Sequence, residues 1–252
     1  MVFYHTKSIQ ESFDLLNSSD MGLTSEEVKR RKEHHGSNIM PEPKEKSLFS
    51  LMLDQFKSPI IYVLLVAAFV SFIIGEFTDA YFIMAVLLVN AVIGFFQEYS
   101  AGKKANALKN AIKTFTYVLR DGVKQEIDSQ ELTLSDIILL ESGSKVPADI
   151  RLVEANDLKV NEALLTGESL SIQKDPHFIT DDEELAVGDR KNMLYAGSYV
   201  ESGRGMGVVC GIGKDTQVGK IATLLAGGSK TKSPLIMRME TFSINIAKII
   251  GI

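Results

Sequence analysis

Two long uncharged stretches dominate the pattern of apolar and polar positions along the chain. Residues 59–75 and 80–97 contain no Asp, Glu, Lys or Arg, and they are 17 and 18 residues long. At about 1.5 Å per residue, a helix of this length nearly spans a hydrocarbon core of about 30 Å. Two helices buried in a soluble protein are the alternative, but adjacent runs joined only by residues 76–79 are difficult to bury in a small domain. The pattern therefore predicts a transmembrane helical hairpin.

Basic residues lie on both outer sides of this hairpin. Three lysines precede the first run and three follow the second: Lys44, Lys46, Lys57, Lys103, Lys104 and Lys109. The connector, residues 76–79, carries two acids and no base. Because basic residues are enriched on the cytoplasmic side of a membrane, both outer ends are expected to be cytoplasmic. The connector then faces the opposite side and is too short to hold an external domain.

Residues 7–36 have the pattern of two short cytoplasmic helices. The second is expected to begin with a capping box, in which the Thr24 side chain accepts from a backbone N–H and the Glu27 side chain reaches back. Gly36 and Pro41 end this segment. A charged, proline-containing linker follows at residues 42–46.

After the hairpin, the pattern changes from helix to strand. Residues 98–112 keep a helical pattern but become polar, so we expect the second membrane helix to continue into the cytoplasm. Further along, Asp121-Gly122 lies between two alternating segments and is typical of a β-hairpin turn. Additional strands are expected at residues 137–140, 150–153, 158–160 and 206–209. These short strands indicate an all-β cytoplasmic domain over about 115–215, followed by a helix over 214–226.

The pattern as a whole divides the chain into five parts. They are N-terminal helices and a linker (1–57), the transmembrane hairpin (58–98), a stalk helix (99–114), the β-rich domain (115–230), and a linker with the start of a third transmembrane helix (231–252). The last part is predicted because residues 242–252 are apolar except for one Ser, one Asn and one Lys.

Composition excludes several other functions. The net charge is −5 and no Lys/Arg cluster alternates with aromatic residues, which argues against nucleic-acid binding. Cys210 is the only cysteine, so an intrachain disulfide is excluded and a reducing compartment is indicated. The glycine-rich segments 203–207 and 211–214 lack the Walker spacing and are interpreted as turns. The adjacent His34 and His35 do not face each other on a helix, so they do not predict a metal site.

The sharpest candidate for chemistry is residues 160–169, Val-Asn-Glu-Ala-Leu-Leu-Thr-Gly-Glu-Ser. A strand-like run ends here in a glycine-containing turn that presents one carboxylate, Glu168. A loop carboxylate beside a glycine can approach a phosphoryl group closely, position a water molecule and accept its proton during hydrolysis. Taken alone, however, Thr-Gly-Glu-Ser is also the sequence of an ordinary surface turn.

In context, residues 160–169 resemble the actuator signature of P-type ATPases. Residues 145–152 resemble the family segment just upstream, residues 90–98 the end of its second membrane helix, and residues 216–222 the exit from its actuator domain. The resemblance covers essentially the whole chain. It implies a membrane protein of mixed α and β structure, with a distorted jelly-roll-like actuator domain and N-terminal helices.

In this family the Thr-Gly-Glu loop enters the phosphorylation site. The resemblance therefore implies that Glu168 aligns the attacking water during hydrolysis of an aspartyl-phosphate, while Thr166 and Gly167 shape the loop. It also implies that movement of the actuator domain couples this hydrolysis to the ion gates of a cation pump.

Within the superfamily, the pattern is most similar to the calcium-pump branch, type II. Residues 22–28 and Gln97-Glu98 both point there, and the absence of Cys-Pro-Cys and Cys-x-x-Cys argues against soft-metal pumps. Two segments depart from the family pattern. Leu134-Ser135-Asp136 stands where many members have Pro-Gly-Asp, and residues 171–174 lack a common proline.

The Asp-Lys-Thr-Gly-Thr motif that accepts the phosphoryl group does not occur in the sequence. The chain alone is therefore expected to be inactive and to bind no cofactor, with Mg²⁺ and ATP used by the complete enzyme. The expected partners are the lipid bilayer, the phosphorylation, nucleotide-binding and remaining transmembrane domains of the pump, and the transported cation.

The expected location is a plasma or inner membrane, with the N-terminus and the actuator domain in the cytoplasm. Residues 1–10 have no apolar core of a cleavable signal. Two alternatives remain open from the sequence. One is a pump for Na⁺, K⁺, H⁺ or Mg²⁺ instead of Ca²⁺, and the other is a non-catalytic membrane protein that regulates a pump by imitating its actuator.

Overall fold

The computed structural model describes residues 2–40, 47–111 and 113–227, and the short pieces 237–238, 241–242 and 244–245. The linker expected at residues 42–46, and most of the expected third span, lie outside the described residues. The chain forms two compact units. One comprises Met1–Glu42 with Lys113–Gly228, and the other Pro43–Ile112 with Ser229–Ile252.

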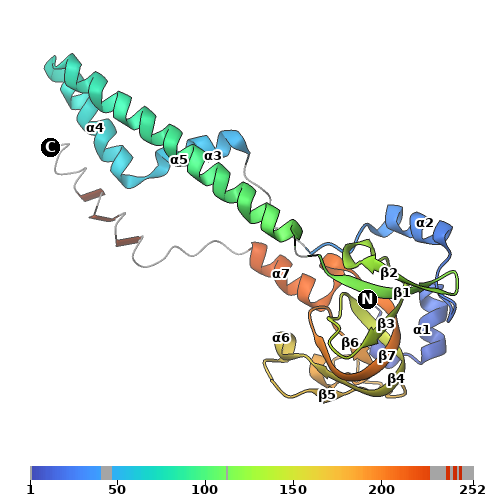
Figure 1. The fold of residues 1–252 in the computed structure, drawn as a ribbon. Coiled ribbons are helices and arrows are strands. Elements are labelled where there is room, and N and C mark those ends of the chain that lie inside the picture. Colours follow the sequence, from blue (N-terminus) through green and yellow to red (C-terminus); the bar gives the residue numbers. More distant parts are fainter. Residues whose placement is uncertain are drawn as a thin grey trace. The chain divides into compact units, whose positions relative to one another are not determined.

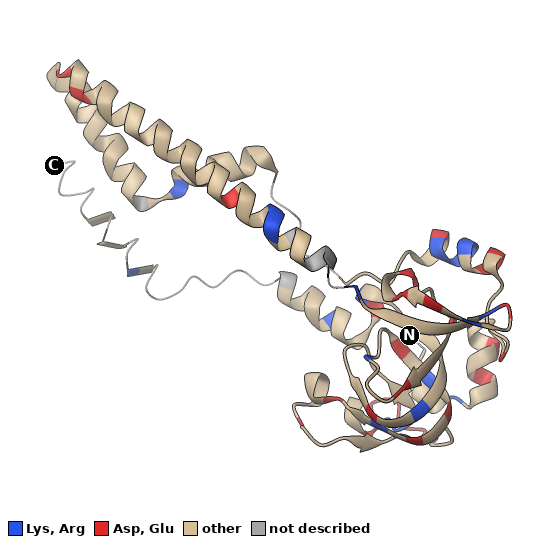
Figure 2. Cartoon of the chain, viewed as in Figure 1, with Lys and Arg blue, Asp and Glu red and all other residues tan. Residues whose placement is uncertain are grey.

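The unit that begins at Pro43 is helical (Figure 1). Its helices are α3 (Leu48–Asp54), a 3₁₀ turn (Gln55–Lys57), α4 (Pro59–Ile74) and α5 (Phe77–Ala111). Both α3 and α4 pack against α5, and Figure 2 shows α4 without a charged residue. The polar continuation of the second helix is confirmed, since α5 runs unbroken for 35 residues.

One helix in the described part of the chain is long and apolar enough to cross a membrane. It covers Phe77–Ala105 and contains an 18-residue stretch with a mean hydropathy of 2.0. A second candidate arises if Leu48–Lys57 and Ile60–Ile74, which meet at a bend of 71°, are counted as one span. The first predicted span corresponds to α4, which has 16 residues, and the second to the longer α5, which has 35.

The connection between α4 and α5 is tighter than expected. The sequence predicts residues 76–79 as the connector, but α5 already begins at Phe77. Gly75 ends α4 with a φ of 93°, a left-handed conformation that glycine adopts without a steric penalty. Asp79 lies in the first turn of α5, where its negative charge interacts favourably with the exposed N–H groups of the helix.

The other unit is built on a seven-stranded antiparallel sheet (Figure 1). The strands are β1 (Phe115–Arg120), β2 (Val123–Asp128), β3 (Ile137–Glu141), β4 (Asp149–Asn161), β5 (Ile172–Gln173), β6 (Met193–Leu194) and β7 (Tyr199–Gly211). Their order is β2-β1-β3-β7-β4-β5, and β6 also pairs with β4. The helices of this unit are α1 (Ile9–Leu16), α2 (Ser25–His35), α6 (Ala163–Thr166) and α7 (Gln217–Gly227).

The predicted β-hairpin is confirmed. Asp121 and Gly122 have φ values of 51° and 70°, and two positive φ angles are what a tight hairpin turn with the natural strand twist requires. The expected all-β domain also contains helical elements, because α6 and two 3₁₀ turns, Ser129–Glu131 and Val187–Asp189, lie between the strands. The expected helix over 214–226 begins later, at Gln217.

β4 and β7 are the longest strands, with 13 residues each. The segments 150–153 and 158–160, which the sequence suggests as separate strands, are the two ends of β4. They look separate because the residues between them are mostly exposed and because the pairing with β7 contains register shifts. Side chains from β1, β3, β4 and β7 form the main apolar core.

Arg151, on β4, holds the N-terminal segment against the sheet. Its side chain is fully buried. It donates hydrogen bonds to the carbonyls of Tyr4 (3.2 Å), Lys7 (2.9 Å) and Pro176 (3.1 Å). Burial lowers the pKa of this guanidinium to about 10, so it remains charged at neutral pH. The carbonyls compensate for the water that the charge has lost.

The two N-terminal helices are confirmed, but the capping box lies elsewhere. Thr24 accepts from the N–H of Glu27 (3.3 Å). The Glu27 carboxylate binds Arg31 instead (2.7 Å). The reciprocal box is found at the start of α1, where Ser8 accepts from the N–H of Glu11 (3.2 Å) and the Glu11 carboxylate accepts from the N–H of Ser8 (2.8 Å).

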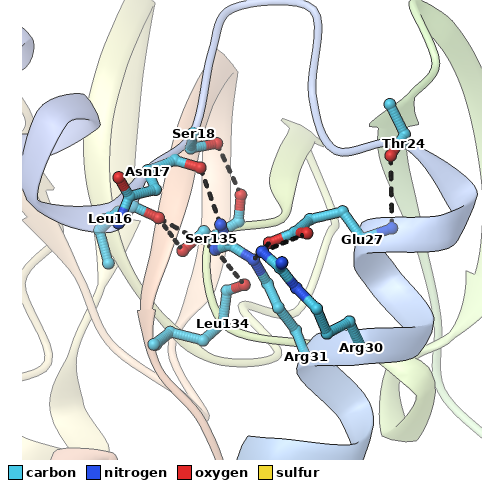
Figure 3. A network of polar contacts seen from close by, with 9 residues as sticks. All are labelled: Leu16, Asn17, Ser18, Thr24, Glu27, Arg30, Arg31, Leu134 and Ser135. Carbon is cyan, nitrogen blue, oxygen red and sulfur yellow. Dashed lines mark hydrogen bonds and ion pairs between the residues drawn. The ribbon is translucent and has the colours of Figure 1, made fainter.

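Arg31 joins α2 to the end of α1 and to the sheet domain (Figure 3). Its Nη1 donates to the carbonyls of Leu16 (2.9 Å) and Leu134 (3.3 Å), and its Nη2 donates to the carbonyl of Asn17 (2.8 Å). The last carbonyls of a helix carry partial negative charge and lack intrahelical donors, so a guanidinium is a suitable partner for them. Glu27 balances the positive charge.

Ser135 completes this attachment (Figure 3). Its side chain donates to the carbonyl of Leu16 (2.8 Å), and its own carbonyl accepts from the Ser18 hydroxyl (2.8 Å). Ser135 has a φ of 72°, a conformation that favours glycine. By the resemblance described above, this position corresponds to the glycine of Pro-Gly-Asp. The hydrogen bonds of Ser135 offset part of the conformational penalty.

We predict that Arg31→Met weakens the attachment of α1 and α2. The substitution removes donors from three carbonyls and should lower the free energy of unfolding by about 2 kcal/mol. Arg30→Met is the matched control, because the Arg30 side chain is 71% exposed and that of Arg31 only 11%. The control should stay within about 0.5 kcal/mol of the wild type. Thermal denaturation of both variants measures the difference in stability. Equal losses of stability in the two variants would show that the contacts of Arg31 with Leu16, Asn17 and Leu134 do not stabilise the domain.

Candidate functional site

A loop of residues 162–174 leaves the sheet after β4 and returns through β5. The sequence predicts a strand that runs straight into a glycine turn, but the helical turn α6 intervenes. Gly167 ends this turn with a φ of 76°, and its N–H donates to the carbonyl of Ala163 (2.9 Å). The left-handed conformation accounts for the glycine at this position.

The three predicted site residues, Thr166, Gly167 and Glu168, lie together in this loop. The Thr166 hydroxyl donates to the carbonyl of Glu162 (3.1 Å) and accepts from the N–H of Glu168 (3.2 Å). Glu168 itself is exposed. The loop therefore has a hydrogen-bonded base and a carboxylate at an accessible position.

Two glycines make room for the base of the loop. A side chain at Gly188 would place its Cβ 2.9 Å from Cγ2 of Thr166, and one at Gly197 would place its Cβ 2.6 Å from Cδ2 of Leu164. Both separations are shorter than an ordinary carbon–carbon contact. The loop thus rests directly on neighbouring backbone, which restricts its movement toward the domain.

A buried ion pair joins the two ends of the loop. Nζ of Lys174 lies 2.6 Å from Oε1 of Glu162, and both side chains are fully buried. Burial raises the pKa of Glu162 and lowers that of Lys174, while the attraction between them opposes both shifts. Sequence reasoning missed this pair. The sequence did contain a clue. Leu158 and Val160 alternate with polar residues, which indicates one buried face of a strand, and Glu162 is the next residue on that face; all three are buried in the structure.

Asp149 is a second buried carboxylate, at the start of β4. It accepts from the N–H of Ala196 (3.0 Å) and from the N–H of Gln217 (2.8 Å), the first residue of α7. Burial raises its pKa to about 6, although these two hydrogen bonds favour the ionised form. The carboxylate therefore caps the beginning of α7.

Comparison with known proteins decides the family. Residues 110–226 match the family described as the P-type ATPase actuator domain, and residues 4–71 match the family described as the N-terminus of cation transporters and ATPases. The chain belongs to the P-type cation-transporting ATPases. The β-rich unit is therefore an actuator domain, which confirms the resemblance seen in the sequence.

Individual P-type ATPases agree with this assignment. A calcium-transporting ATPase of Listeria monocytogenes is 40% identical over 239 residues, which cover 95% of this chain and 27% of the relative. A calcium-transporting ATPase of Bacillus subtilis is 38% identical over 238 residues, with 94% and 27% covered. A cation-transporting ATPase of Synechocystis is 38% identical over 237 residues, with 94% and 26% covered. The chain spans about a quarter of the length of these relatives.

The actuator loop does not form a cofactor site by its own residues. Mg²⁺ is bound through several oxygen ligands, usually with substrate phosphates among them. The loop contributes one exposed carboxylate, Glu168. Within the part of the chain that the structure describes, no group of three or more His, Cys, Asp or Glu side chains is arranged to hold a metal ion.

We predict that Asp149 makes the stability of the actuator domain depend on pH. Its folded pKa of about 6 lies above the ordinary value of 3.8, so the folded state holds the proton more strongly than the unfolded state. This contribution is complete below pH 4 and is lost as the pH rises to about 6, a change of roughly 3 kcal/mol. Asp149→Asn removes it.

Denaturation of the wild type and of Asp149→Asn at pH 4 and pH 7 measures this contribution. The wild type should lose stability relative to the variant as the pH rises. Asp157→Asn is the control, because Asp157 is exposed on the same strand. A stability difference between wild type and Asp149→Asn that is equal at both pH values would contradict the prediction.

Proposed function

We propose that this chain is the N-terminal part of an ATP-driven calcium pump, and that its actuator domain promotes hydrolysis of an aspartyl-phosphate. The observation that carries the proposal is the Thr166–Glu168 loop, which is hydrogen-bonded at its base and exposed at its carboxylate within an actuator domain. Calcium is proposed because relatives at 36–40% identity are named calcium-transporting ATPases.

In the proposed mechanism, Glu168 aligns the attacking water and accepts its proton. A positioned general base of this kind typically contributes a factor of about 10² to 10⁴ to the rate. Thr166 holds the N–H of Glu168, and Gly167 allows the turn, so both set the position of the carboxylate. In the complete enzyme, ATP would supply the phosphoryl group and Mg²⁺ would neutralise its charge, and both would be held by domains other than this one.

The helical unit is proposed to cross the bilayer as a hairpin, with the N-terminus and the actuator domain on the cytoplasmic side of a plasma or inner membrane. The apolar helix Phe77–Ala105 and the basic residues outside the two uncharged runs support this orientation. The five-part division of the chain is retained as part of the proposal, and the antiparallel sheet is proposed to close as a distorted jelly roll.

The proposed coupling is mechanical. Three connections, residues 37–57, 98–114 and 227–241, would link the actuator to the membrane helices. Rotation of a compact domain held at three points would pull on three helices together. The remaining membrane, phosphorylation and nucleotide-binding domains would complete the pump and bind the transported ion.

A pump for another cation is the second candidate, because relatives from Synechocystis and Mycobacterium at 38% identity are named only as cation-transporting. Phosphorylation by ATP in the presence of Ca²⁺, Na⁺, K⁺, H⁺ or Mg²⁺ as the varied ion separates these cases. A regulatory protein that imitates an actuator would lack the Asp-Lys-Thr-Gly-Thr motif beyond residue 252, and the downstream coding sequence tests that.

We predict that Glu168→Gln in the complete pump leaves phosphorylation by ATP intact and slows loss of the phosphoenzyme by about 100-fold or more. The amide keeps the size of the side chain but cannot accept the proton. Decay of radiolabelled phosphoenzyme after a chase with unlabelled ATP gives the rate. Glu154→Gln, at an exposed position on β4, is the control and should decay like the wild type. Normal decay in Glu168→Gln would exclude the assigned role.

A further inference from the structure

An ion pair between Glu162 and Lys174 links the two ends of the loop that carries Glu168. The chain leaves the sheet after Asn161, presents Glu168, and returns through β5 (Ile172–Gln173), which directly precedes Lys174. The salt bridge of 2.6 Å therefore joins the first and last residues of the loop directly. It is formed by two side chains with no exposed surface.

Stability alone does not explain a pair of this kind. The transfer of two charges from water to a protein interior is so unfavourable that a buried ion pair can often be replaced by apolar residues without loss of stability. The pKa shifts of the two residues reflect this unfavourable transfer, because burial raises the pKa of Glu162 and lowers that of Lys174. What an ion pair provides is a defined geometry, since each charge tolerates only positions close to its partner.

Hydrogen bonds connect this pair to Glu168. The carbonyl of Glu162 accepts from the N–H of Leu165 (2.9 Å), from the N–H of Thr166 (3.1 Å) and from the Thr166 hydroxyl (3.1 Å). The same hydroxyl accepts from the N–H of Glu168 (3.2 Å). The ion pair that restrains the Glu162 side chain therefore also restrains the Glu162 carbonyl. That carbonyl accepts the hydrogen bonds that hold Leu165 and Thr166 in place.

The other end of the pair is anchored to the sheet. The backbone N–H of Lys174 donates to the carbonyl of Leu158 on β4 (2.9 Å). The two preceding residues, Ile172 and Gln173, form the paired strand β5. The backbone of Lys174 is thus held to β4, whereas Glu162 begins the segment that leads to Glu168.

We propose that Glu162 and Lys174 are positioning residues for hydrolysis of the aspartyl-phosphate, because their buried salt bridge sets the place of Glu168 relative to the sheet. This inference rests on the proposed function of Glu168. A misplacement of about 1 Å can slow a reaction by about 100-fold, so a modest shift of the loop is enough to be measured.

The test uses the full-length pump with three variants: Glu162→Met, Lys174→Met and the double variant. Each single variant leaves one buried group without its partner, and is expected to lower the melting temperature and to slow phosphoenzyme decay. The double variant removes both charges at similar volume. It is expected to recover the melting temperature but to keep a decay about tenfold slower than the wild type, with phosphorylation by ATP unchanged.

Wild-type decay in the double variant would overturn the proposal, since the pair would then be only structural. Amide hydrogen exchange covers the case in which the double variant stays unstable. Measured well below all melting temperatures, exchange should increase about tenfold at residues 165–168 and remain unchanged in β1 and β2. An increase spread over the whole sheet would also overturn the proposal. Lys159→Met, at an exposed position on β4, is the control for loss of a lysine.

Glu168→Gln measured beside these variants separates the two proposals. If Glu168→Gln decays slowly and the double variant decays normally, only the positioning role fails. If Glu168→Gln decays normally, the proposed function of Glu168 fails, and the positioning role for that step fails with it.

Discussion

The rule that a buried charge needs a partner organises the actuator domain around β4. Asp149, Arg151 and Glu162 lie at the beginning of this strand and just beyond its end, and all three are buried. Each contacts a different part of the chain. Asp149 binds the beginning of α7, Arg151 binds N-terminal backbone carbonyls, and Glu162 binds Lys174 across the loop. Since an unpaired charge in the interior is strongly unfavourable, these elements can occupy only a narrow range of positions relative to β4.

In this arrangement the buried part of the domain is rigid while the Glu168 carboxylate stays exposed, and both properties suit the proposed role of the domain. The apolar core and the charged contacts of β4 are buried, whereas Glu168 is exposed. A catalytic group that must enter a site on a different domain has to be accessible before it arrives and correctly placed when it does. Short-range hydrogen bonds through Thr166 and a buried salt bridge between the two ends of the loop satisfy both requirements without covering the carboxylate.

Local features of the fold could be predicted from the sequence, whereas features that depend on tertiary contacts could not. The Asp121-Gly122 turn was predictable because its positive φ angles are a property of two adjacent residues. The continuity of β4 was not, because its middle is exposed and its register shifts against β7. The capping box at Thr24 failed for a similar reason. Its Glu27 is engaged by Arg31, whose position follows from contacts with distant carbonyls.

The difference between local features and features that depend on tertiary contacts also applies to the candidate site and to Ser135. The turn at Thr166–Glu168 was predictable because its residues are contiguous in the sequence, but the partner of Glu162 lies 12 residues away and depends on how β5 pairs. Ser135 replaces a glycine common in the family and keeps the left-handed backbone that glycine favours. Its hydroxyl binds Leu16, so the substitution adds a directional contact between the sheet and α1. Because hydrogen bonds fix orientation more narrowly than apolar packing does, this contact and those of Arg31 hold the N-terminal helices to the sheet in one defined arrangement.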